Sequence, residues 1–140
     1  MYLYKMNDTI VGAMAVTMYQ GKDYHAIEWA KQVEDNEAAV IHIIASPVYF
    51  YGLSAQVKAV IDRCHNPLRD TFNIKKTALL LVGASTLPEL FDSIITQYKL
   101  CLNFFQLEDA GCVVARGVKD KGDIKNTKAF NEAYELGRLV

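Results

Sequence analysis

The sequence predicts a three-layer α/β domain whose central sheet is mainly parallel. Continuous apolar and β-branched runs at 38–46, 75–85 and 110–118 are typical of strands that are covered on both faces. Segments with helical apolar spacing follow each run, and strands that alternate with helices build a parallel sheet between two helix layers. The 140 residues are enough for one such domain with a buried core.

Two further elements are expected before the first buried run. Residues 1–6, MYLYKM, predict a short strand, because Tyr and Leu favour a pleated surface. Residues 23–37 predict a charged helix with one apolar stripe at Ala26, Trp29, Ala30 and Val33. The helices expected after the buried runs lie at 54–65, capped by Ser54, at 87–106 and at 126–140.

Composition excludes several classes of function. The chain has 15 Lys and Arg against 16 Asp and Glu, so no basic surface for nucleic acid is predicted. The apolar runs are shorter than the roughly 20 residues of a membrane span, and the first residues do not resemble a signal peptide. The three cysteines, Cys64, Cys101 and Cys112, suggest neither a disulfide framework nor a metal site. We expect a cytoplasmic protein.

Parallel α/β sheets bind ligands beyond the carboxyl ends of their strands, which places the candidate loops at 46–54, 83–88 and 116–123. In the first loop, SPVYFYGLS, Pro47 fixes the exit from the strand, and Gly52 allows a positive φ or a close backbone approach. The three consecutive aromatic residues between them suit a planar ligand with polar edges. The alternative is that these aromatics pack under a neighbouring loop.

The segment 45–63, ASPVYFYGLSAQVKAVIDR, resembles the second strand-loop-helix unit of flavodoxin-like NAD(P)H-dependent FMN reductases. It is especially similar to the branch related to iron–sulfur flavoproteins, as is the closing stretch at 117–140. The resemblance implies a flavodoxin-like fold and an oxidoreductase that takes hydride from NAD(P)H and delivers electrons to a quinone, free flavin or similar small molecule. The flavin carries that chemistry, so no catalytic side chain is expected.

The resemblance also implies the cofactor-binding positions. In the family the Ser-Pro-x-Tyr loop lies along the isoalloxazine ring of FMN and offers backbone N–H groups to its polar edge. The stretch VGAST, residues 82–86, resembles the family's second flavin-facing loop. The matching residues are Ser46, Pro47, Val48, Tyr49, Phe50, Tyr51 and Gly52 in the first loop, and Gly83, Ala84 and Ser85 in the second.

Two departures from the family pattern are expected to matter. The family opens with a strand and a G-S-P-R-x-x-G-N-T loop that binds the FMN phosphate at a helix N-terminus, and nothing similar occurs here. The chain starts where the family's second strand would start, so we expect the first β-α unit to be missing and FMN binding to be weak or lost. The positions of the cluster cysteines hold Val11, Met14, Thr17 and Asp23, so no iron–sulfur cluster is expected.

A missing central strand would leave two sheet edges with unpaired backbone N–H and C=O groups, at about 1–3 kcal/mol for each buried group. Three solutions are open: residues 1–6 shift inward, residues 8–22 form a replacement strand, or a second copy lends one. We favour the last, a homodimer or higher oligomer, because an apolar sheet edge is a template for pairing. The alternative function is a cofactor-less scaffold that acts as a binding or oligomerisation module without enzymatic activity.

Other polar residues are expected to be structural. His42 lies in a buried run, so we expect its imidazole to lie in the core, bonded to a neighbouring group. Residues 119–123, KDKGD, predict a turn whose Asp123 caps the next segment of the chain. We expect the three cysteine side chains to be unreactive and to lie in or near the core.

Overall fold

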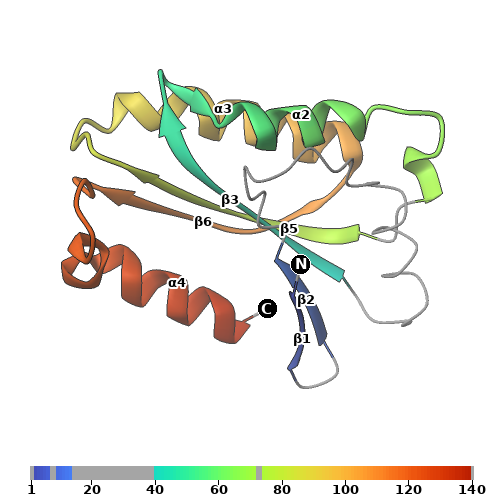
Figure 1. The fold of residues 1–140 in the computed structure, drawn as a ribbon. Helices are drawn as coiled ribbons and strands as arrows, with labels where there is room; N and C mark the ends of the chain where they lie inside the picture. The colour runs from blue at the N-terminus through green and yellow to red at the C-terminus, as the bar shows by residue number, and fades with distance from the viewer. Residues whose placement is uncertain (1, 7–8, 14–39, 72–73, 140) are drawn as a thin grey trace.

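The structure is a computed structural model that describes residues 2–6, 9–13, 40–71 and 74–139. It confirms the predicted three-layer α/β fold. Figure 1 shows helices on both faces of a twisted sheet, with α2 and α3 on one face and α4 on the other. The helices are α2 (Ala55–Arg63), α3 (Glu89–Phe105) and α4 (Lys128–Leu139), with short 3-10 helices at Arg69–Thr71 and Asp123–Asn126.

The sheet is mainly parallel, as predicted. Its strand order is β1-β2-β3-β5-β6, and β4 pairs with β3 off this path. Neighbours from β2 to β6 along this order are parallel, whereas β1 is antiparallel to β2 and β4 is antiparallel to β3. The strands are β1 (Tyr2–Met6), β2 (Thr9–Ala13), β3 (Val40–Tyr49), β4 (Gly52–Leu53), β5 (Ile74–Gly83) and β6 (Glu108–Arg116).

The position beside β3 is filled by the chain itself. Strand β2 lies parallel to β3, with Val11 opposite Ile41 and Ala13 opposite Ile43. Residues 9–13, part of the segment 8–22 that was considered as a strand, therefore pair with β3, and a strand from a second copy is not required at this position. The predicted helix at 23–37 lies outside the described residues, as do Met14, Thr17 and Asp23.

The core follows from the alternation of side chains along β5. Leu79 and Leu81 pack against one stripe of α3, whereas Leu80 and Val82 pack against the α4 side. This two-sided burial confirms the prediction made from the continuous apolar run. The stripe of α3 consists of Phe91, Ile94, Tyr98 and Leu102, and the α4 cluster contains Val113, Ala115 and Ala129.

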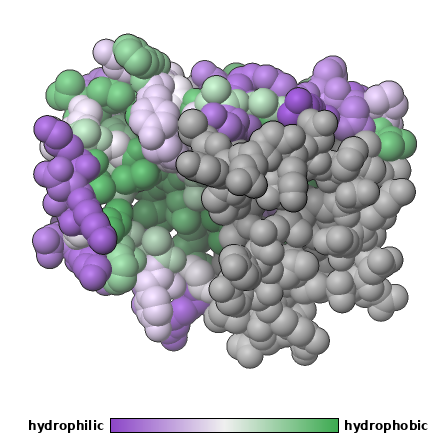
Figure 2. All heavy atoms as spheres, in the orientation of Figure 1, coloured by the Kyte–Doolittle hydropathy of each residue, from purple (hydrophilic) through white to green (hydrophobic). Residues whose placement is uncertain are grey.

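The sheet face on the α4 side is partly open in the described part of the chain. Ile44 and Val48 pack toward α3, so Ile43 and Ala45 face the other side, where Ala45 is exposed. Figure 2 shows apolar residues on the floor of a hollow, bordered on one side by hydrophilic residues. In the described ranges, α4 packs against the β5 and β6 side of this face. No helix of these ranges is long and apolar enough to span a membrane.

Candidate functional site

The three loops singled out in the sequence meet at one edge of the sheet. Strands β3, β5 and β6 are parallel neighbours, so their carboxyl ends lie together. Pro47 is opposite Val82, and Gly83 is opposite Arg116. The structure therefore brings the first predicted loop next to the second, and the second next to the loop after β6.

Backbone hydrogen bonds fasten the second loop to the third. The N–H of Val118 donates to the Gly83 carbonyl at 3.0 Å, and the N–H of Gly117 donates to the Ser85 carbonyl at 3.1 Å. The Ser85 hydroxyl accepts the N–H of Leu87 at 3.1 Å, so this side chain is used within its own loop. Ala84, between the two anchored residues, is exposed.

The first loop is a β-hairpin and not an irregular loop. The sequence suggested that the strand stops at Ser46, but β3 continues to Tyr49 and turns back into β4. Val48 is opposite Leu53, and Tyr49 is opposite Gly52. Among the described residues, β2 pairs with β3 only as far as Ile43, and proline is accepted where one side of a strand lacks a ladder partner, which fits Pro47 at this point of β3.

Ser46 joins the hairpin to helix α2. Its side chain is buried, and its hydroxyl donates to the Pro47 carbonyl at 2.7 Å and accepts the N–H of Ser54 at 3.0 Å. Ser54 in turn accepts the N–H of Val57 at 3.4 Å, which confirms it as the cap of α2. The Ser46 hydroxyl is therefore engaged in holding the hairpin.

The turn has an unusual backbone. Phe50 and Tyr51 have φ values of 45° and 64°, both in the left-handed region, as in a two-residue type I′ turn. Such turns favour Asn-Gly. The positive φ considered for Gly52 thus falls on the two aromatic residues before it.

The aromatic side chains of the turn face solvent. Tyr49 and Tyr51 are each 63% exposed, and Phe50 is 99% exposed. The interpretation that they pack under a neighbouring loop is wrong. A flat, apolar and accessible surface therefore stands at the edge where the loops meet.

Two residues at this edge were missed in the sequence. Ser93 of α3 donates a hydrogen bond from Oγ to the Tyr51 carbonyl at 2.9 Å. Arg116 ends β6 with an exposed side chain, and its Cζ lies 5.3 Å from the ring centroid of buried Phe91. This cation–π contact holds a positive charge beside Gly83, where an anionic ligand group would be favoured.

Asp123 differs from its predicted role. Its carboxylate accepts the N–H groups of Lys119 at 3.0 Å and Asp120 at 2.7 Å, so it closes the loop before it instead of capping the segment after it. These backbone hydrogen bonds lower the pKa of the Asp123 carboxyl below its ordinary value. The third loop is thereby given a fixed shape.

The model of the NADPH-dependent FMN reductase family matches residues 3–108. The chain belongs to this family. Membership implies an FMN cofactor and an NAD(P)H co-substrate.

Two proteins of Bacillus subtilis are similar to this FMN reductase family member. One, from strain 168, is YwqN, named as a putative NAD(P)H-dependent FMN-containing oxidoreductase; it is 23% identical over 128 residues, which cover 80% of this chain and 71% of YwqN. The other is the solved structure of the Trp repressor binding protein, with a TM-score of 0.56 and 23% identity over 71% of this chain and 68% of that one. The likeness to the solved structure supports the fold alone.

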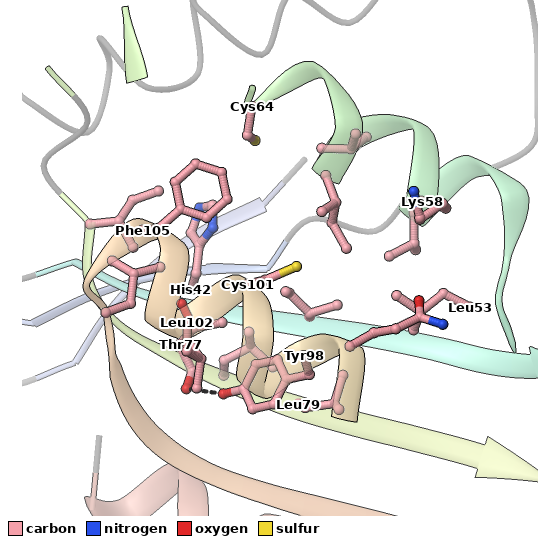
Figure 3. Close-up of a pocket in the computed structure, with 18 of the residues that line it drawn as sticks. His42, Leu53, Lys58, Cys64, Thr77, Leu79, Tyr98, Cys101, Leu102 and Phe105 are labelled. Atoms are coloured by element: carbon pink, nitrogen blue, oxygen red, sulfur yellow. Dashed lines mark hydrogen bonds between the residues drawn. The ribbon is translucent and has the colours of Figure 1, made fainter. Parts of the chain in front are cut away.

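A separate cavity of about 200 Å³ lies between α2, α3 and the sheet of this family member (Figure 3). Its lining is mostly apolar and extends from Leu53 of the hairpin to Phe105 at the end of α3. The Tyr98 hydroxyl lies 2.5 Å from the Thr77 carbonyl, to which it donates. On β3 and β5 the cavity is lined by residues 42–45, 74, 77 and 79, which precede the carboxyl ends of these strands, and residues 49–52 of the turn are not part of its lining.

The two thiols that line the cavity are half-buried. Burial raises the pKa of both Cys64 and Cys101, which line the cavity, above the ordinary thiol value. Cys112, which lies outside the cavity on β6, is exposed; partial desolvation and the nearby Asp109 carboxylate raise the pKa of its thiol. These shifts support the expectation of unreactive cysteines. Within the described ranges no cluster of three or more His, Cys, Asp and Glu residues is placed to hold a metal.

The two glycines among the predicted flavin-facing residues are expected to respond differently to substitution. A Cβ at Gly83 would lie 3.0 Å from Cζ of Phe91, whose ring is fully buried, so Gly83→Ala should lower the free energy of unfolding by about 1–3 kcal/mol. A Cβ at Gly52 would meet only the Tyr49 carbonyl oxygen at 3.7 Å, so Gly52→Ala should change it by less than about 0.5 kcal/mol. Urea denaturation of both variants measures the difference. Equal stabilities would contradict the close packing of Gly83 on Phe91.

Proposed function

We propose that the hairpin turn and the loop at 83–85 bind the isoalloxazine ring of FMN, and that the protein takes hydride from NAD(P)H and delivers electrons to a small acceptor such as a quinone or free flavin. One observation carries this proposal. Three exposed aromatic side chains stand on a turn whose backbone is strained, at the edge of the sheet where the loops meet.

The left-handed backbone of the turn lowers the stability of the protein when no ligand is bound. A left-handed conformation costs an L-residue about 1–2 kcal/mol, and Phe50 and Tyr51 both adopt it. Exposing their apolar side chains recovers none of this cost. Such strain is usually kept where a site needs a particular backbone shape, which supports a ligand at the turn.

The residues present fit a flavin ring. Exposed aromatic faces stack on flat rings, and Tyr49, Phe50 and Tyr51 present such faces at the turn. Arg116 supplies a positive charge for an anionic group of FMN or NAD(P)H. FMN, when bound, supplies hydride acceptance and electron delivery, so the role of these residues is to bind and orient it.

The proposed role of the turn in flavin binding is tested by titrating the purified protein into FMN and following quenching of the flavin fluorescence. Phe50→Ala should weaken FMN binding roughly three- to tenfold, because an aromatic stacking contact is worth about 0.5–1.5 kcal/mol. Phe130→Ala, at an exposed aromatic residue of α4, should leave the affinity unchanged. A wild-type protein that neither quenches FMN nor oxidises NAD(P)H in its presence would favour the scaffold without a cofactor.

We also propose that ring contacts dominate flavin affinity in this chain. The 140 residues contain no match to the family's phosphate loop, so the phosphate should add little to binding. Riboflavin should then bind within roughly tenfold of FMN, a difference of about 1.4 kcal/mol. A far larger preference for FMN would show that another part of the chain binds the phosphate.

Self-association remains a proposal on different grounds. The sequence suggested a dimer because a sheet edge was expected to be unpaired. Strand β2 occupies the position beside β3, so that argument no longer applies. The apolar sheet face that α4 leaves open over β3 in the described ranges is the remaining argument for a homodimer. Sedimentation velocity across a range of protein concentrations decides between a monomer and an oligomer.

A further inference from the structure

The strained turn is tied to the helix layer through one residue. In the described part of the chain, the only side-chain hydrogen bond from another element to Phe50 or Tyr51 is the one that Ser93 Oγ donates to the Tyr51 carbonyl at 2.9 Å. The two residues are 42 positions apart, so the bond joins the tip of the hairpin to α3. The base of the hairpin is held separately by Ser46.

We propose that Ser93 is a positioning residue of the flavin site: it holds the turn in the shape that presents its aromatic and backbone groups to the isoalloxazine ring. This inference rests on the proposed function. It assigns to α3 a part in ligand binding that the sequence of the turn does not reveal.

The geometry explains why one hydroxyl matters here. A peptide group is planar, so a fixed Tyr51 carbonyl also fixes the plane that joins Tyr51 to Gly52. The turn has two residues in a costly conformation and would move toward commoner backbone shapes if it were not held. A bond at the second of these residues opposes that movement where the strain lies.

Helix α3 is a firm support for this bond. Phe91 and Ile94, on either side of Ser93 in the sequence, are both fully buried in the core. Ser93 itself is exposed, and alanine is the better helix former at such a position. Serine at this position therefore does not stabilise the helix relative to alanine, whereas its hydroxyl donates the hydrogen bond to the turn.

The test compares Ser93→Ala with two other variants. Ser93→Thr keeps a hydroxyl at the position. Thr96→Ala removes an exposed hydroxyl from the next turn of α3. This hydroxyl makes no hydrogen bond to any described residue. All three should fold, because neither position contributes to the core.

The first readout is limited proteolysis with chymotrypsin, without FMN. The protease cleaves after aromatic residues, and Tyr49, Phe50 and Tyr51 stand exposed at the tip. Ser93→Ala should be cleaved there roughly two- to fivefold faster than wild type, the loss expected for an exposed hydrogen bond. Ser93→Thr and Thr96→Ala should match wild type. Equal cleavage of Ser93→Ala and wild type would overturn the inference.

The second readout is the dissociation constant for FMN, from quenching of its fluorescence. Ser93→Ala should bind FMN roughly two- to fivefold more weakly, and Ser93→Thr should restore the affinity. Faster cleavage with unchanged FMN affinity would overturn the positioning role while leaving the proposed function intact. Failure of the wild-type protein to bind FMN would overturn both, and the wild-type titration alone distinguishes this result.

Discussion

Phe91→Ala should lower the free energy of unfolding by about 3–5 kcal/mol, the usual cost of emptying a fully buried phenylalanine site. The ring of Phe91 belongs to the core cluster of α3 and β5, and it lies against Gly83 and below the Arg116 guanidinium. Its loss leaves a cavity under the loop at 83–85, so FMN binding should weaken as well. Urea denaturation measures the stability, and fluorescence quenching measures the affinity.

The control for this substitution is Leu100→Ala on the same helix. Leu100 is 64% exposed, so its removal should cost less than about 1 kcal/mol. A loss below about 1 kcal/mol for Phe91→Ala as well would contradict the packing of α3 on the sheet.

Acidification should destabilise the fold through His42. Burial lowers the pKa of His42 from 6.5 to about 4 in the folded protein. The unfolded chain therefore takes up a proton at higher pH than the folded one, so the contribution of neutral His42 is present above pH 6.5 and is lost as the pH falls toward 4. Between about pH 7.5 and 4.5, the loss of unfolding free energy due to His42 is about 2–3 kcal/mol.

His42→Leu isolates this contribution, because other groups also titrate in that range. The loss of unfolding free energy between about pH 7.5 and 4.5 should be smaller in His42→Leu than in wild type by about 2–3 kcal/mol. His65→Leu, at an exposed histidine, is the matched control. Identical pH dependence in wild type and His42→Leu would show that the His42 imidazole is protonated as easily in the folded state as in the unfolded one.

The sequence was sufficient for the layers and most strands, because strands buried on both faces leave continuous apolar runs. It was less informative about where β3 ends. Pro47 usually marks a strand end, but here pairing with β5 and β4 carries the strand on to Tyr49. The place of residues 9–13 in the sheet also stayed open among three solutions, because short apolar segments do not identify their pairing partners.

The candidate loops were located from the strand order and their flavin-facing roles from the resemblance, and the structure places the two loops side by side at one edge of the sheet. Local sequence did not reveal the strain in the turn, because Gly52 offered a residue that adopts positive φ without cost and the chain places it on Phe50 and Tyr51 instead. Ser93 and Arg116 were missed for another reason. Each meets the site only through tertiary contacts, with the Tyr51 carbonyl and with the Phe91 ring.

The Phe-Tyr turn bears on how this protein would respond to laboratory evolution. Asn-Gly at positions 50 and 51 would suit the same backbone better, so a screen for heat resistance alone should enrich such replacements. Each would remove an aromatic face from the surface that we assign to the flavin. If the turn binds flavin as we propose, rounds of selection without an activity filter would then yield more heat-resistant variants with weaker affinity for FMN.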